Sequence, residues 1–151
     1  HRGYTMEKEI NFGESLNEIL SHRNINVNDF AKAINISWST AYSWLRNSTE
    51  PNLTALIATA DYLKCTIEFL IGRSADESAI VGKNYPPIAQ RIKEVMKESG
   101  ISSYKLRKIS KYDGSYFYNW EHGSEPLLST LIELSNLFDC TIDHLIGREE
   151  V

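Results

Sequence analysis

CTIEFLIGR at residues 65–73 occurs again, 75 positions later, as CTIDHLIGR at residues 140–148. The similarity extends backward from both stretches, so that residues 12–73 and 88–148 are two copies of one pattern, with 18 identities in 61 aligned pairs. A recurring unit of this kind defines the structural unit of a chain. Two copies of about 60 residues predict two small domains in tandem, because a solenoid needs more repeats to bury a continuous core.

The boundaries follow from composition on either side of the copies. Residues before Met6 are interpreted as a tag remnant, and the stretch between the copies is small, charged and glycine-containing before Pro86-Pro87 opens a helix. We therefore expect the following division: an N-terminal extension at 1–11, domain one at 12–73, a linker at 74–85, domain two at 86–148 and a tail at 149–151.

Apolar residues in both copies recur at helical spacing, and no run alternates long enough to predict a strand. Ser37 and Asp113 are good N-cap residues for a third helix in each copy. Ile34 in copy one and Ile109 in copy two are expected on the inner face of the second helix. The fold predicted is all-α, with two tandem five-helix domains.

Composition limits the class of protein. With 42% hydrophobic residues the chain can bury cores, although each half is near the lower limit for folding alone, so packing between the halves is expected to matter. The apolar runs are too short for a membrane span, and the first residues lack the apolar segment of a signal peptide. The expectation is a cytoplasmic protein with no membrane partner.

No arrangement of residues indicates catalysis or a cofactor. The four histidines pair with no carboxylate or cysteine at a catalytic or metal spacing, and no glycine-rich phosphate loop is present. Cys65 and Cys140 hold equivalent places; a disulfide or metal pair is one reading, and a small buried hydrophobe is favoured. We expect no enzyme activity, no catalytic residue, no metal and no cofactor.

Charge is unevenly distributed. The net charge of −4 gives little support to a polyanion partner, since such partners favour basic surfaces. Copy one carries five Lys and Arg against six Asp and Glu, and copy two carries eight of each. In copy two, however, four cations fall within seven residues: Lys105, Arg107, Lys108 and Lys111.

The second and third helices of each copy resemble the helix-turn-helix of the phage-repressor family, the Cro-like or XRE class. Two sets of residues carry the resemblance: in copy one Phe30-Ala31, Asn35-Ile36-Ser37, Ala41, Trp44 and Pro51, and in copy two Leu106, Tyr112-Asp113, Phe117, Trp120-Glu121-His122-Gly123 and Pro126. The major groove admits one helix, and the preceding helix braces it across the phosphates. The resemblance implies that the third helix of each copy is a reading helix.

The resemblance also implies site residues. In copy one, Trp38, Ser39 and Ser43 would face base edges, with Ser37, Thr40 and Arg46 nearer phosphates. In copy two the base-facing positions are Gly114, Ser115 and Asn119, with Tyr116 and His122 toward the backbone. Three lysines, Lys105, Lys108 and Lys111, are expected to bind phosphates, with a solvated helix face as the alternative. Exposed aromatics such as Trp38 and Tyr118 fit DNA contact or a protein interface.

Copy two departs from the family pattern. Arg107 stands where a small residue is expected, and Lys111 stands where glycine is common, so an altered turn is predicted there. Neither copy opens its second helix with the family's usual glutamine, since Val27 and Ser103 occupy those positions. Copy two is therefore the less certain reader.

The function predicted is sequence-specific binding of double-stranded DNA by a repressor-like transcriptional regulator. Two tandem domains suggest a covalent pseudo-dimer on two half-sites about 34 Å apart. The rival is a protein-interaction or dimerisation module in which one or both domains have lost DNA reading. A homodimer or another protein partner stays open, as do the operator and the sign of regulation.

Overall fold

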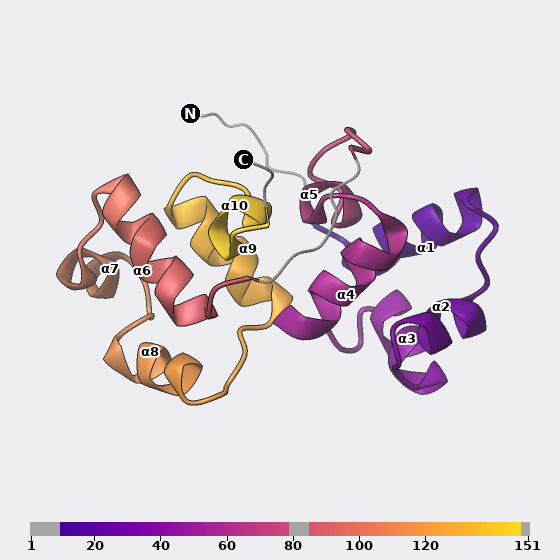
Figure 1. Ribbon diagram of the computed structural model, residues 1–151, viewed down its shortest axis with the longest axis horizontal. Coiled ribbons are helices and arrows are strands. Elements are labelled where there is room, and N and C mark those ends of the chain that lie inside the picture. Colours follow the sequence, from indigo (N-terminus) through magenta and orange to yellow (C-terminus); the bar gives the residue numbers. More distant parts are fainter. Residues whose placement is uncertain (1–9, 79–84, 149–151) are drawn as a thin grey trace.

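Ten helices make up the computed structural model, which describes residues 10–78 and 85–148 (Figure 1). The first repeat contains α1 (Phe12–His22), α2 (Val27–Ala33), α3 (Trp38–Leu45), α4 (Leu53–Leu63) and α5 (Ile67–Leu70). The second contains α6 (Ile88–Ser99), α7 (Ser103–Ile109), α8 (Gly114–Glu121), α9 (Leu128–Leu137) and α10 (Ile142–Ile146). The described residues contain no strand, only an isolated bridge between Asn52 and Leu127. The predicted all-α fold of two five-helix domains is confirmed.

Local sequence explains where the helices begin. Ser37 accepts a hydrogen bond from the amide of Thr40, and Asp113 accepts one from the amide of Ser115, so both predicted N-caps are confirmed. Cap residues of the same kind precede α1, α2, α4, α5, α7 and α10. Within residues 10–78 and 85–148, no helix has the length and apolarity needed to cross a bilayer.

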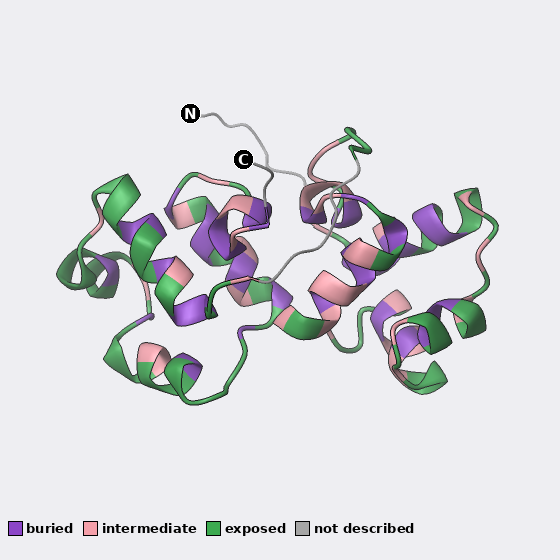
Figure 2. Cartoon of the chain, in the orientation of Figure 1, coloured by how far each residue is buried: buried purple, intermediate pink, exposed green. Residues whose placement is uncertain are grey.

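The buried residues form one apolar cluster that runs through both repeats. Trp44 of α3 and Trp120 of α8 point into the core, as expected, and each is largely buried. Figure 2 shows buried residues concentrated on α9 and α10, with exposed residues dominating α7 and the outer side of α8. Cys65 is fully buried, and both cysteines are thiols, which agrees with the reading of a small buried hydrophobe.

One core prediction is wrong. Ile109, expected inside the second helix of repeat two, is 46% exposed at the end of α7. It is equivalent to Ala33, which is also exposed, so the apolar side chain stands on the outer face of the helix. Its partner in the prediction, Ile34, is half-buried and packs against the core.

The two repeats are joined by contacts that occur twice, with the roles exchanged. At the centre of the molecule, the amide of Leu53 donates to the carbonyl of Pro126 at 3.1 Å, and the amide of Leu128 donates to the carbonyl of Pro51 at 3.0 Å. These backbone bonds lie at the start of α4 and α9, which meet in the middle of Figure 1. A contact set of this kind is isologous, like the interface of a twofold dimer.

Carboxylates of each repeat cap helices of the other. Glu50 accepts from the amide of Ser129 at 2.6 Å, and Glu125 accepts from the amide of Thr54 at 2.8 Å. These bonds satisfy amide groups that a helix N-terminus otherwise leaves without partners, and the negative charge suits the helix dipole. The starts of α4 and α9 are thus stabilised from across the interface.

The same exchange holds at α5 and α10. Asp143 accepts from the amide of Ile67 at 3.0 Å, and Glu68 accepts from the amide of Ile142 at 2.8 Å. The two arginines that close the repeated motif cross over as well: Arg148 donates to Asp61 at 2.8 Å and Arg73 donates to Asn136 at 2.9 Å. Each arginine also pairs with the capping carboxylate of its own repeat, Arg148 with Asp143 and Arg73 with Glu68.

Candidate nucleic-acid interface

The reading helices α3 and α8 lie on the same edge of the molecule, on either side of the α4 and α9 pair (Figure 1). Each follows a shorter helix, α2 or α7. Each is anchored in the core by its own buried tryptophan, Trp44 or Trp120. The isologous interface fixes both helices relative to one axis through the centre. In helix-turn-helix dimers, two helices related by such an axis enter one face of a duplex.

The first turn of α3 carries neutral hydroxyl groups. The Ser37 hydroxyl donates to the Thr40 hydroxyl at 2.8 Å and lies 3.1 Å from the Ser39 hydroxyl. Ser43, one turn later, accepts a hydrogen bond from the Thr49 hydroxyl at 2.7 Å. Four of the predicted site residues, Ser37, Ser39, Thr40 and Ser43, therefore make side-chain hydrogen bonds along α3.

Two further predicted residues of repeat one stand at the ends of α3. Trp38 is 58% exposed and its ring packs against Tyr42, with the centroids 4.7 Å apart. Arg46 is the C-cap of α3 and is exposed. The structure thus brings an apolar ring, hydroxyls and one cation together on the outer face of α3.

The equivalent surface on α8 has a different character. Asp113 accepts from both the amide and the hydroxyl of Ser115, at 3.0 and 2.6 Å. These hydrogen bonds from Ser115 lower the pKa of the Asp113 carboxyl, so a negative charge stands at the start of α8. Glu121 adds a second negative charge at the other end, paired with Lys93 at 3.0 Å.

The aromatic residues of α8 are partly committed to packing. Tyr116 lies between Tyr112 and Trp120, with centroid distances of 4.9 and 5.9 Å, so it belongs to the edge of the core. His122 stacks on Tyr118 at 4.0 Å, and its Nδ1 lies 2.7 Å from the Tyr118 carbonyl oxygen. Asn119 is exposed between them. Within the described residues, Asn119 has an exposed side chain that makes no hydrogen bond, whereas Ser115 donates to Asp113.

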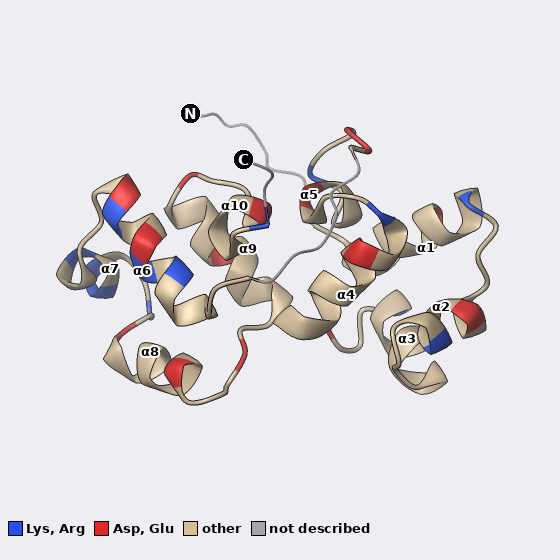
Figure 3. Cartoon of the chain, in the orientation of Figure 1, with Lys and Arg blue, Asp and Glu red and all other residues tan. Residues whose placement is uncertain are grey.

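The basic cluster of repeat two lies on α7, at the far end of the molecule from the interface (Figure 3). Lys105, Lys108 and Lys111 are exposed, as is Arg107. Within residues 10–78 and 85–148, none of these four cations makes an ion pair. Lys108 and Arg107 lie over the ring of Tyr104, at 5.3 and 5.9 Å from its centroid, and Lys111 lies 5.6 Å from that of Tyr112.

The turn before the reading helix also differs between the repeats. In repeat one, Asn35 takes a left-handed conformation with φ of 59°, and the amide of Ile36 donates to the Ala31 carbonyl. In repeat two, Ser110 is extended with φ of −151°, its hydroxyl donates to the Leu106 carbonyl, and it accepts from the Tyr112 amide. Asparagine adopts the left-handed conformation more readily than lysine does. Lys64 takes it at the end of α4, with φ of 54°, but Lys111 does not have a positive φ. The altered turn predicted from Lys111 is confirmed.

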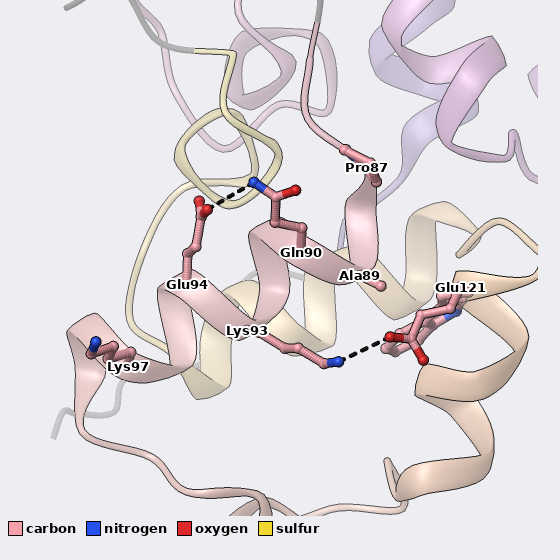
Figure 4. A pocket seen from close by; sticks show the side chains of 8 residues that line it. Pro87, Ala89, Gln90, Lys93, Glu94, Lys97 and Glu121 are labelled. Atoms are coloured by element: carbon pink, nitrogen blue, oxygen red, sulfur yellow. Dashed lines mark hydrogen bonds and ion pairs between the residues drawn. The ribbon is translucent and has the colours of Figure 1, made fainter.

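A cavity of about 560 Å³ opens between α6 and α8 (Figure 4). Ala89 and Trp120 form its base, and Lys93 reaches across to Glu121 at one side. The position of Ala89 is Gly13 in repeat one, where an added Cβ would lie 2.4 Å from the Leu45 carbonyl oxygen. Helices α1 and α3 therefore approach more closely than a methyl group allows, whereas α6 and α8 accommodate one.

Sequence reasoning missed the carboxylates Glu50, Glu125, Glu68 and Asp143, which set the position of one reading helix relative to the other. The recurrence of Glu50-Pro51 as Glu125-Pro126 was the available signal. Among the residues that the structure describes, no group of His, Cys, Asp and Glu is arranged to hold a metal ion.

These features define the chain as a tandem helix-turn-helix protein. The Cro/C1-type HTH DNA-binding domain matches residues 15–76 and again residues 91–150. The chain belongs to this family, whose members are typically DNA-binding rather than enzymatic.

Two comparisons with individual proteins complete the picture. A crystal structure of a transcriptional regulator from Listeria innocua aligns with 68% of this chain and 88% of its own, at 19% sequence identity and a TM-score of 0.41. No curated protein sequence matches the chain.

Proposed function

We propose that the chain binds double-stranded DNA sequence-specifically, as a transcriptional regulator whose two repeats act as a covalent pseudo-dimer. The observation that carries this proposal is the isologous interface, in which four carboxylate caps and a pair of arginine contacts recur with the repeats exchanged. A twofold pair of reading helices suits two half-sites one helical turn, about 34 Å, apart.

Covalent linkage supports useful affinity in an acidic chain. The first repeat presents few cations, and the net charge is −4, so a single domain would gain little from phosphate contacts. Joining two modules makes the second binding event intramolecular, which raises its effective concentration. Two weak contacts then combine into one stronger complex.

The proposed contacts follow the sequence expectation. On α3 they are Trp38, Ser39 and Ser43 toward bases and Ser37, Thr40 and Arg46 toward phosphates. In repeat two they are Ser115 and Asn119 toward bases, with these residues toward the backbone: Lys105, Lys108, Lys111, Tyr116 and His122. The exposure of Trp38 and Asn119 supports these positions, whereas the packing of Tyr116 leaves it a smaller role.

Selection of bound fragments from a random pool of double-stranded DNA, at near-physiological salt, tests the proposal. Enrichment of a motif with spaced half-sites is the expected result. Absence of any enriched sequence from a folded protein would overturn the proposal.

The second candidate function is a protein-interaction module that uses the same face. The exposed rings Trp38 and Tyr118, which are 58% and 60% exposed, favour it, because aromatic residues are enriched at protein interfaces. Salt titration separates the two functions. A DNA reader with several phosphate contacts weakens steeply as salt rises, and an apolar protein interface does not.

A further inference from the structure

The hydroxyl groups of the two reading helices are hydrogen-bonded in different ways. Ser43 on α3 accepts its hydrogen bond from Thr49, so the hydroxyl hydrogen of Ser43 is left to donate outward. Ser115 on α8 donates its hydroxyl hydrogen to Asp113, so the exposed donor of α8 is the amide of Asn119, the residue equivalent to Ser43. In the major groove, guanine N7 and O6, adenine N7 and thymine O4 are all acceptors, so a free donor is what reads them.

The charge at the start of each reading helix favours α3 as the reader of bases. The N-cap of α3 is the neutral Ser37, whereas that of α8 is the carboxylate Asp113. The N-terminal residues of a reading helix are the ones that reach base edges. A carboxylate there repels the phosphates on both sides of the groove and can accept hydrogen bonds only from the amino groups of cytosine and adenine. The start of α8 is therefore a poorer reader than the start of α3.

Cations show the opposite asymmetry. Repeat two has three exposed cations on α7 and a fourth, Lys111, in the turn that follows, whereas α2 has only Lys32, accompanied by Asp29. Tyr104, 62% exposed, holds Lys108 and Arg107 near its ring by cation–π attraction. We call Tyr104, Lys105, Arg107, Lys108 and Lys111 the α7 patch.

Resting on the proposed DNA-binding function, we infer that the repeats divide the task. Helix α3 reads the base sequence of one half-site, and the α7 patch holds the phosphate backbone of the other half-site with little regard to sequence. The α7 patch binds the phosphate backbone of duplex DNA. Its four cations make no ion pair within the described residues, and they match a regular array of negative charge. The operator then has one specified half and one relaxed half.

The experiment measures sequence preference and salt dependence on the full chain. The bound motif is first selected from random duplexes, and affinity is then measured on duplexes with every base substituted in turn, over a salt series. Lys105→Ala with Lys108→Ala should weaken all duplexes by the same factor and lower the slope of log affinity against log salt by up to about two units. Lys97→Ala, an exposed lysine on α6, is the matched control and should leave both quantities unchanged.

Two double variants, one on α3 and one on α8, test which helix reads the bases. Ser39→Ala with Ser43→Ala should flatten discrimination in the specified half by about 5- to 150-fold per lost contact, with little change for unrelated duplexes. Ser115→Ala with Asn119→Ala should flatten discrimination by a clearly smaller factor, because the carboxylate of Asp113 stands at the start of α8.

The outcomes separate the inference from the function on which it rests. Two equally specified half-sites, or an equally large loss of preference in the Ser115 and Asn119 double variant, would overturn the division of tasks and leave DNA binding standing. An unchanged salt slope in the lysine double variant would show that the α7 patch faces something other than phosphate, such as an acidic protein. Failure to bind any duplex would remove both the inference and the proposed function.

Discussion

Repeat one and repeat two present the same contacts to each other and different surfaces to solvent. At the interface, Glu50 corresponds to Glu125, Glu68 to Asp143 and Arg73 to Arg148, and each pair makes exchanged contacts. Around the reading helices the pairs diverge, with Ser37 against Asp113 and Asn35 against Lys111. The comparison teaches that the interface constrains both repeats, while each outer surface is adjusted separately.

The largest effect is expected from the most buried part of the interface. Asp143→Ala removes the acceptor of the Ile67 amide at the start of α5 and leaves the buried guanidinium of Arg148 with Asp61 alone, so the free energy of unfolding should fall by about 3–5 kcal/mol. Urea denaturation measures this loss.

The matched variant is Glu68→Ala. The side chains of Asp143 and Arg148 are 3% and 0% exposed, against 13% and 21% for Glu68 and Arg73, so water compensates the second pair better. A smaller loss is expected for Glu68→Ala. Equal losses would mean that burial does not distinguish the two halves of the interface.

The helix spacing of the two repeats gives the next effect. In Gly13→Ala the new methyl group meets the carbonyl oxygens of Leu45 and Trp44, so α1 and α3 must separate, at a cost of about 1–3 kcal/mol. Thermal or urea unfolding checks this value. The reverse change, Ala89→Gly, meets no such contact and should cost only about 0.5–1 kcal/mol through helix propensity. A harmless Gly13→Ala would show that α1 and α3 have room to move apart.

The exchanged caps at α4 and α9 differ in a smaller way. Helix α4 has its own cap, Asn52, in addition to Glu125, whereas Leu127 at the start of α9 provides no side-chain cap. Helix α9 therefore depends on Glu50, and Glu50→Ala should cost about 1–2 kcal/mol. Glu125→Ala should cost less in the same denaturation experiment. The reverse order would contradict the dependence of α9 on its neighbour.

The smallest effect concerns the start of α8. Because hydrogen bonds from Ser115 lower the pKa of Asp113, the unfolded state takes up a proton before the folded state as pH falls. Its stabilising contribution is complete above the unfolded pKa of about 3.9 and is lost as pH falls through the lower folded value. Amide protection at Ser115 should decline over that range, whereas protection at Thr40 should not. An Asp113→Asn variant that keeps the same decline would assign it to another group.

The helices could be predicted from sequence because their causes are local. A cap such as Ser37 and a buried residue such as Trp44 reveal themselves through neighbours within one or two turns. The prediction for Ile109 was wrong because it rested on the apolar side chain alone. Ile109 occupies the position equivalent to Ala33, and both residues are exposed. The altered turn at Lys111 was predictable, since the backbone requirement belongs to a single position.

The interface could not be predicted in the same way. Glu50 and Glu125 were visible as a recurring pair, but each caps a helix more than 70 residues away in the chain. Nothing in local spacing connects such groups. On the reading helices the sequence identified the outward positions, whereas the hydrogen-bond direction that separates Ser43 from Ser115 depends on Thr49 and Asp113 in the folded chain.

The exchanged contacts have a consequence for how recognition can evolve. In a homodimer one gene encodes both subunits, so any substitution changes both half-sites at once and keeps the target palindromic. In this chain the two halves of the twofold interface are encoded separately, and a mutation at Asp113 or Lys111 leaves Ser37 and Asn35 untouched. On the proposed DNA-binding function, each half of the target can then change independently, while the caps at Glu50, Glu125, Glu68 and Asp143 keep the symmetric interface.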